Sequence, residues 1–227
     1  MKTLIFDSGP LINLSMNGFL YILEELKKSF NGKFLITEQV KYETLDRPLK
    51  IQIFELGALR IQDLLQKKVL ELPSSLNISN SEISKKTAEL KNIANNLLEN
   101  NGNGIEIVSD AEISCLALSY ILKEKNIESL IAIDERTTRL LSENPKELEE
   151  TISKKTHFSV KLSKKNLFHL SKFSDFKFIR SPELIYVAHK KGLLHLKDPK
   201  ALEASLYATK FKGSSISWEE IKILKKL

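Results

Sequence analysis

The sequence has little of what marks secreted, membrane-bound or disulfide-stabilised proteins. Its 227 residues include a single cysteine, Cys115, so no disulfide can form within the chain. No apolar run is long enough for a signal peptide or a membrane span. We therefore expect a cytoplasmic protein with no membrane partner. Because apolar residues surround Cys115, we expect this thiol to lie in the core.

Two enzyme classes that open with a strand are excluded by the residues after positions 3–6. A dinucleotide-binding fold needs a glycine-rich turn at this point. A haloacid-dehalogenase-type phosphatase needs a second aspartate two residues after the first. The chain instead has Asp7, Ser8 and Gly9. The four histidines also lack the spacing of a metal site or a catalytic triad.

The composition indicates a globular chain with enough apolar residues for a core, since 42% of residues are hydrophobic and 28% charged. Short β-favouring runs alternate with amphipathic stretches, which favours an α/β fold. We expect one domain over residues 1–227: a three-layer α/β/α arrangement around a short-stranded, mainly parallel sheet. The predicted strands cover residues 3–6, 34–36, 69–72, 130–133 and 176–179. The predicted helices include 11–30 and 81–100, and 101–104 is predicted as a flexible turn.

Acidic residues follow two of these predicted strands directly. Residues 3–6 end at Asp7, and residues 130–133 end at Asp134. Glu43 comes about two helical turns after the second strand, and Asp110 begins a helix. Ligands of parallel sheets bind beyond the carboxyl ends of the strands. If the strands are parallel, these four carboxylates can therefore meet at one edge of the sheet.

Each of these acids also has a purely structural interpretation. Asp7 and Asp134 can cap the helices that follow them. Glu43 can be a solvated helix residue, and Asp110 can simply favour a helix dipole. Sequence alone leaves both interpretations open for every one of them.

Glu112 is a fifth acid close to this set. Ser109 and Glu112 have the spacing of a helix capping box, which accounts for Glu112 without a metal. We keep Glu112 as a further candidate metal ligand beside Asp110, with capping as its favoured role.

A cluster of such acids implies cations. Two carboxylates about 5 Å apart repel by about 3 kcal/mol at an effective dielectric of about 20. Oxygen ligands select hard ions such as Mg²⁺ or Mn²⁺. Ions of this kind activate water and stabilise charge on a phosphoryl oxygen, so the implied reaction is phosphodiester hydrolysis.

Several of these motifs together resemble the PIN-domain family of metal-dependent ribonucleases, which includes VapC-type toxins. The matching pieces are residues 4–12, Glu43, residues 110–118 and residues 131–136. Gly9 departs from the family pattern, because that position is often Ser or Asn and could hold a metal-bound water. The resemblance implies an endoribonuclease that uses Mg²⁺ or Mn²⁺. Its catalytic residues would be Asp7, Glu43, Asp110 and Asp134, and its metal ligands Asp7, Glu43, Asp110, Glu112 and Asp134.

The resemblance also names partners. They are RNA, a second copy of the chain and an antitoxin-type protein. Ser8 matches a hydroxyl position beside the first acid, and Arg136 could reach a phosphate or form a surface ion pair.

Residues 143–176 look like a basic insertion within the domain. The stretch 153–180 has eight basic residues against one acid, whereas the whole chain carries +6, and five phenylalanines lie among them. Basic side chains mixed with aromatic rings suit phosphates and exposed bases. Alternatively, the phenylalanines pack inward while the lysines face out. Candidate RNA-binding residues are Ser8, Arg136, Lys154, Lys155, Lys164 and Lys165. The rival to catalysis is a PIN-like scaffold that binds RNA or a protein through 153–180.

Overall fold

The centre of the molecule is a parallel β-sheet of five strands. The structure is a computed structural model that describes residues 1–100 and 103–227. The strand order is β3-β2-β1-β6-β8, and every neighbouring pair is parallel. The bounds are β1 Lys2–Phe6, β2 Gly32–Leu35, β3 Leu70–Glu71, β6 Glu128–Ala132 and β8 Phe178–Ile179. The prediction of an α/β fold with a mainly parallel sheet is confirmed.

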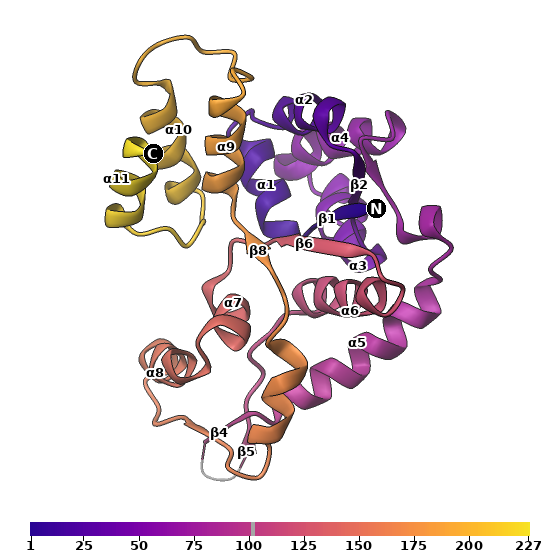
Figure 1. Ribbon diagram of the computed structural model, residues 1–227, viewed down its shortest axis with the longest axis vertical. Coiled ribbons are helices and arrows are strands. Elements are labelled where there is room, and N and C mark those ends of the chain that lie inside the picture. The colour runs from indigo at the N-terminus through magenta and orange to yellow at the C-terminus, as the bar shows by residue number, and fades with distance from the viewer. Residues whose placement is uncertain (101–102) are drawn as a thin grey trace.

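Helices cover both faces of this sheet (Figure 1). One face carries α1 Ser8–Met16, α2 Tyr21–Ser29 and α9 Ser181–Lys190, and the other carries α3 Glu38–Lys41 and α6 Asp110–Glu124. The remaining α-helices are α4 Gln52–Gln66, α5 Asn80–Asn95, α7 Arg136–Glu143, α8 Pro145–Thr156, α10 Ala201–Phe211 and α11 Trp218–Lys226. Short helical turns are η1 Tyr42–Asp46, η2 Pro48–Lys50, η3 Pro73–Leu76 and η4 Leu167–Phe173.

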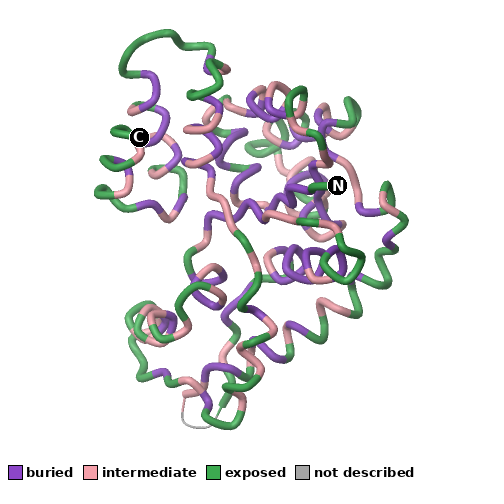
Figure 2. The backbone as a smooth tube through the Cα atoms, viewed as in Figure 1, coloured by how far each residue is buried: buried purple, intermediate pink, exposed green. Residues whose placement is uncertain are grey.

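The core lies between the sheet and these helices. Ile5, Phe6, Leu35 and Ile131 are fully buried, because strands covered on both faces must be apolar on both. The helix α6 is buried along most of its length and appears as a purple coil in Figure 2. Cys115 lies on it as a buried free thiol, as the sequence predicted.

The predicted helix over residues 11–30 is wrong as one element. It is two helices, α1 and α2, separated by a turn at Asn17 and Gly18. Gly18 has a φ of 72°, a left-handed conformation that glycine adopts without a steric penalty.

A second, smaller sheet lies apart from the central one. It is antiparallel and has the order β5-β4-β7, with β4 Leu98–Asn100, β5 Asn103–Gly104 and β7 Lys161–Leu162. The predicted helix 81–100 therefore ends early, at Asn95, because Asn95 and Asn96 favour a helix end over a helix interior. Of the predicted turn 101–104, residues 101–102 lie outside the described residues.

This small sheet, together with α8 and η4, forms what we call the satellite lobe: residues 98–100, 103–104 and 145–173. It occupies the lower end of the molecule in Figure 1. The predicted insertion 143–176 is thus joined by a strand from a distant part of the chain. None of the helices in ranges 1–100 and 103–227 is long and apolar enough to cross a membrane.

Candidate functional site

Asp7 lies buried at the carboxyl end of β1, the middle strand of the sheet. Its Oδ2 accepts a hydrogen bond from the Gly9 N–H at 3.2 Å and caps α1. Its Oδ1 is buried and has no hydrogen-bond partner among the described residues. The capping interpretation of Asp7 is therefore confirmed for Oδ2, while Oδ1 takes no part in the cap.

The charge of Asp7 is unfavourable in its surroundings. Burial first, and then the Glu112 and Glu43 carboxylates, raise the pKa of Asp7 to about 7, although the Ser8 and Gly9 N–H groups lower it. A buried carboxyl group whose pKa is raised by neighbouring acids is typical of functional sites. A cation bound at Oδ1 would favour the ionised form of Asp7 and so lower its pKa.

Glu43 is partly exposed and lies on η1, a turn of π-helix. Its Oε1 accepts a hydrogen bond from the Gln39 side chain at 3.3 Å. Single π-helical turns inside helices occur frequently at functional sites. The Glu43 charge is the last and smallest of the causes that act on the pKa of Asp7, after burial and the Glu112 charge.

Glu112 is the other acid whose charge raises the pKa of Asp7. Its Oε2 accepts from the Ser109 N–H at 2.9 Å and from the Thr138 hydroxyl at 2.8 Å, which completes the predicted capping box and fixes the carboxylate. Burial raises the pKa of Glu112 despite these hydrogen bonds. Capping and proximity to Asp7 are therefore compatible, because both hydrogen bonds use the same oxygen.

Asp110 lies away from this cluster. Its side chain is 56% exposed and pairs with Lys91 of α5 at 2.6 Å. Residues two positions apart in an α-helix point in directions about 200° apart, so the side chains of Asp110 and Glu112 lie on different sides of α6. Of the two acids at the start of α6, the structure brings Glu112 towards Asp7 and turns Asp110 to α5.

Asp134 is buried, and protein donors occupy both of its oxygens. Its Oδ1 accepts from the Ser181 N–H at 2.8 Å and the Ser214 hydroxyl at 3.0 Å. Its Oδ2 accepts from the Ser181 hydroxyl at 2.7 Å and the Asn13 amide at 3.4 Å. Burial raises the pKa of Asp134, and the Ser181 and Ser214 bonds partly oppose this. These four donors, which we call the Asp134 cage, join β6 to α1, α9 and the loop before α11.

The six predicted substrate-binding residues are spread over the strand edge and the satellite lobe. Ser8 begins α1 beside Asp7. Arg136 pairs with Glu147, and Lys154 pairs with Glu150 on an exposed helix. Lys155 approaches Glu135 at 3.6 Å, and the Glu135 charge acts on the pKa of Glu112. Among these lysines, Lys155 lies beside an acid whose charge acts on Glu112.

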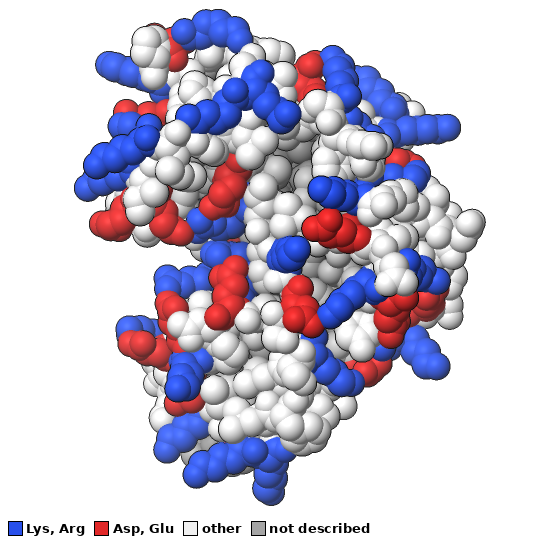
Figure 3. Space-filling model, in the orientation of Figure 1, with Lys and Arg blue, Asp and Glu red and all other residues white. Residues whose placement is uncertain are grey.

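Lys164 and Lys165 are exposed on the lobe and have no ion-pair partner in the described ranges. Figure 3 shows basic side chains at this lower end of the molecule. The nearby phenylalanines divide between the two interpretations. Phe158 and Phe168 are exposed, Phe173 is buried, and Phe176 and Phe178 pack against the core.

Residue-type patterns missed several groups that position these acids. Thr138 orients Glu112, while Ser181 and Ser214 hold Asp134. The Glu135 charge acts on the pKa of Glu112. Its position directly after Asp134 could have marked it as a residue near the site. The serines carry no such signal, because isolated hydroxyls occur throughout the sequence.

The residues present fit a divalent cation in part. Within residues 1–100 and 103–227, no group of three or more Asp, Glu, His or Cys side chains converges on one point as a metal cage would. Mg²⁺, however, usually keeps several waters and takes one or two protein carboxylates. Asp7, whose Oδ1 accepts no hydrogen bond from the residues that the structure describes, could supply one such carboxylate, and Glu112 a second.

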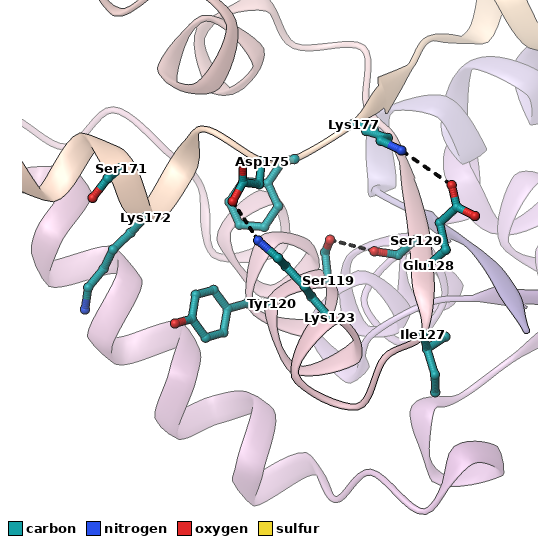
Figure 4. Close-up of a pocket in the computed structure, with 11 residues that line it drawn as sticks. Ser119, Tyr120, Lys123, Ile127, Glu128, Ser129, Ser171, Lys172, Asp175 and Lys177 are labelled. Atoms are coloured by element: carbon teal, nitrogen blue, oxygen red, sulfur yellow. Dashed lines mark hydrogen bonds and ion pairs between the residues drawn. The ribbon is translucent and has the colours of Figure 1, made fainter.

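A separate cavity of about 380 Å³ lies between α6, the start of β6 and η4. Three lysines line it, but Lys123 pairs with Asp175 at 2.6 Å and Lys177 with Glu128 at 3.4 Å (Figure 4). Lys172 pairs with Glu89. These charges are balanced within the chain, and we assign no ligand to this cavity.

Comparisons with protein-family models, with curated proteins and with solved structures find no match to this chain. Any function has to be inferred from the residues themselves.

Proposed function

We propose that the chain is a PIN-like, Mg²⁺- or Mn²⁺-dependent ribonuclease that hydrolyses RNA phosphodiester bonds. The observation that carries this proposal is Asp7: a buried carboxyl group at the end of the middle strand, with one oxygen that has no hydrogen-bond partner among residues 1–100 and 103–227. Burial, and then the Glu112 and Glu43 charges, raise its pKa. Retaining such a costly group is reasonable where a ligand stabilises its charge.

The roles of the side chains follow from their positions. Asp7 and Glu112 would hold the cation, and the partly exposed Glu43 would add a further negative charge near it. Thr138 and the Ser109 N–H keep Glu112 in one orientation. A divalent cation of this type, when bound, activates water and stabilises negative charge on a phosphoryl oxygen.

The Asp134 cage and Asp110 have other roles in this proposal. Asp134 fixes the end of β6 relative to α1 and α9, so it positions the site without touching the cation. Asp110 is an exposed ion-pair residue and serves as a matched control for carboxylate loss.

The direct test is cleavage of mixed-sequence RNA by the full chain with and without Mn²⁺. We expect Asp7→Asn to reduce cleavage by at least about 100-fold, and Asp110→Asn to change it less than about twofold. Binding of Mn²⁺, measured by calorimetry, should weaken in Asp7→Asn but not in Asp110→Asn. Cleavage that persists in excess chelator, or in Asp7→Asn, would contradict the proposal.

A second candidate is a non-catalytic scaffold that binds RNA through the satellite lobe. The exposed rings of Phe158 and Phe168 favour it, and so do Lys164 and Lys165, which form no ion pair with any residue that the structure describes. RNA binding without cleavage in any metal, lost in a Phe158→Ala, Phe168→Ala variant, would select this alternative.

A further inference from the structure

A groove of about 610 Å³ lies between α1, α4 and the short turns η1 and η2, and we call it the α1–α4 groove. This volume falls in the range of small-ligand sites, about 300–1,000 Å³. Its walls are mainly apolar, with Ile12 and Met16 from α1 and Ile53 and Phe54 from α4. These four side chains are between 40% and 82% exposed, so the lining is open to solvent. Exposed apolar side chains that surround one hollow mark a binding surface.

The groove leads away from the proposed cation site. Ser8, Ile12 and Met16 follow one another at four-residue intervals, so they lie on one side of α1. Ser8 begins α1 directly after Asp7, and this side of the helix therefore connects the strand end to the groove. Ile12 lies about 6 Å along the helix from Ser8, a distance that one nucleotide can span. On the η1 side, Glu43 itself lines the groove.

Two arginines give the groove a positive rim. Arg47 lies between η1 and η2, Arg60 lies on α4, and both line the groove. Both are exposed, and neither forms an ion pair within residues 1–100 and 103–227. Arg60 donates one N–H to the Ser15 carbonyl at 3.1 Å, which holds its guanidinium against α1. Its other N–H donors have no acceptor in the part of the chain that the structure describes, so they are available to a ligand.

Apolar walls and a cationic rim together match one nucleotide of a single strand. The faces of a base are flat and stack on aromatic rings, while the attached phosphate pairs with basic side chains. A purely apolar ligand would use the walls but leave both arginines without an anion.

We propose that the α1–α4 groove binds one unstacked base of the RNA, next to the bond that is cut, and selects guanine at that position. This proposal rests on the proposed ribonuclease function and adds a base preference that the cation site itself does not supply. Phe54 stacks on one face of the base, and Ile12 and Met16 close the groove on the other. Arg47 contacts the neighbouring phosphate.

Arg60 distinguishes guanine from the other bases. A guanidinium donates two parallel N–H groups to O6 and N7 of guanine. Adenine keeps N7 but has an amino donor in place of O6, so it faces the guanidinium donor to donor. Cytosine and uracil have no N7. Guanine is therefore the base that makes both contacts with Arg60.

The preference is measured first as binding, in chelator, where no metal-dependent cleavage takes place. The full chain is added to fluorescent oligouridylates that carry one central guanine or adenine, and the anisotropy is recorded. We expect guanine to bind about tenfold more tightly than adenine. Arg60→Lys should abolish this preference while changing the affinity for the adenine oligonucleotide less than about twofold, because the charge remains and the fork of donors is lost. Phe54→Ala should weaken binding of the guanine oligonucleotide about tenfold.

The second measurement is cleavage of mixed-sequence RNA by the full chain with Mn²⁺, with the ends of the products sequenced. Wild type should show guanine enriched about tenfold at one fixed position beside the cut. Arg60→Lys should lose this enrichment while it still cleaves. The matched control is Leu59→Ala, which changes an exposed apolar residue of α4 that does not line the groove. It should leave both the binding and the enrichment unchanged.

The outcomes separate this inference from the ribonuclease function. Guanine-selective binding without cleavage in any metal supports the groove and overturns the ribonuclease function. Cleavage without a fixed guanine, a preference that Arg60→Lys and Phe54→Ala leave intact, or no binding of either oligonucleotide overturns the inference. If Phe54→Ala changes the sedimentation coefficient of the protein but not its base preference, the groove is a protein contact and the inference is overturned. Far-UV circular dichroism checks that each variant is folded.

Discussion

Two aspartates follow two neighbouring strands of one sheet, and the fold treats them in opposite ways. Within the described part of the chain, Asp7 after β1 has one oxygen without a hydrogen-bond partner, and the Glu112 and Glu43 charges act on its pKa after burial. Asp134 after β6 has both oxygens filled by four donors. The local sequence pattern is the same, so the difference comes from what distant elements bring to each strand end. Distant elements bring acidic charges near Asp7, whereas they bring hydroxyl and amide donors to Asp134.

The largest expected change in stability comes from removing the acceptor of the Asp134 cage. Asp134→Ala leaves the Ser181 N–H, two hydroxyls and one amide without their acceptor. At about 1 kcal/mol for each lost bond, the free energy of unfolding should fall by about 4 kcal/mol. Urea denaturation measures this directly. Wild-type stability in Asp134→Ala would show that the cage is not structural.

Asp7 should respond in the opposite direction. The pKa of Asp7 in the folded protein, about 7, lies above its ordinary value of 3.8. The proton on Asp7 therefore stabilises the fold fully below about pH 4, and this contribution is lost as the pH rises through about 7. Without metal at neutral pH, Asp7→Asn should stabilise the protein by about 2 kcal/mol, with a ceiling of about 4 kcal/mol from the full shift.

The measurement for Asp7 is the difference in unfolding free energy between wild type and Asp7→Asn, from pH 4 to pH 8 in chelator. It should favour the variant increasingly as the pH rises. Saturating Mg²⁺ should abolish this trend, because a cation favours the ionised carboxylate. A difference that does not change with pH would mean that Asp7 ionises as an ordinary surface acid.

The two acids at the start of α6 give a third, smaller contrast. Glu112→Gln should weaken Mn²⁺ binding about 10- to 100-fold, as the loss of a ligand or of its orienting group does. Asp110→Asn should change it less than about twofold, since its partner is Lys91. Calorimetric titration of both variants decides between them. Equal losses would restore Asp110 to the metal site predicted from the sequence.

The smallest expected effect concerns the satellite lobe. Replacing Lys164 and Lys165 by glutamine should lower the slope of RNA affinity against salt by about 1.4, or about 0.7 for each phosphate contact. The paired Lys154 and its neighbour Glu150 provide the control, because their charges already cancel. An unchanged slope would place RNA elsewhere on the molecule.

The sequence predicted the elements whose signals are local. The capping box at Ser109 and Glu112 forms as their spacing implies. The parallel sheet follows from strands that are apolar on both faces. These features depend on residues a few positions apart, so a pattern is sufficient to find them.

The cage could not be predicted in this way. Ser181 is 47 positions from Asp134, and Ser214 is 80 positions away. Nothing in either serine distinguishes it until the tertiary fold brings it to the strand end. The capping box at Glu112 was predicted, but only the structure shows that capping uses one carboxylate oxygen and leaves the group beside Asp7.

The pairing of β4 with β7 has a consequence for the modularity of the chain. Leu98 and Leu162 lie opposite one another in adjacent antiparallel strands, yet α6, β6 and α7 lie between them in sequence. The satellite lobe is therefore not a cassette that can be removed by one cut. Deleting residues 143–176 would remove β7, one of the two neighbours of β4, and expose Leu98, which is fully buried. A minimal version of this fold has to shorten the chain at both places.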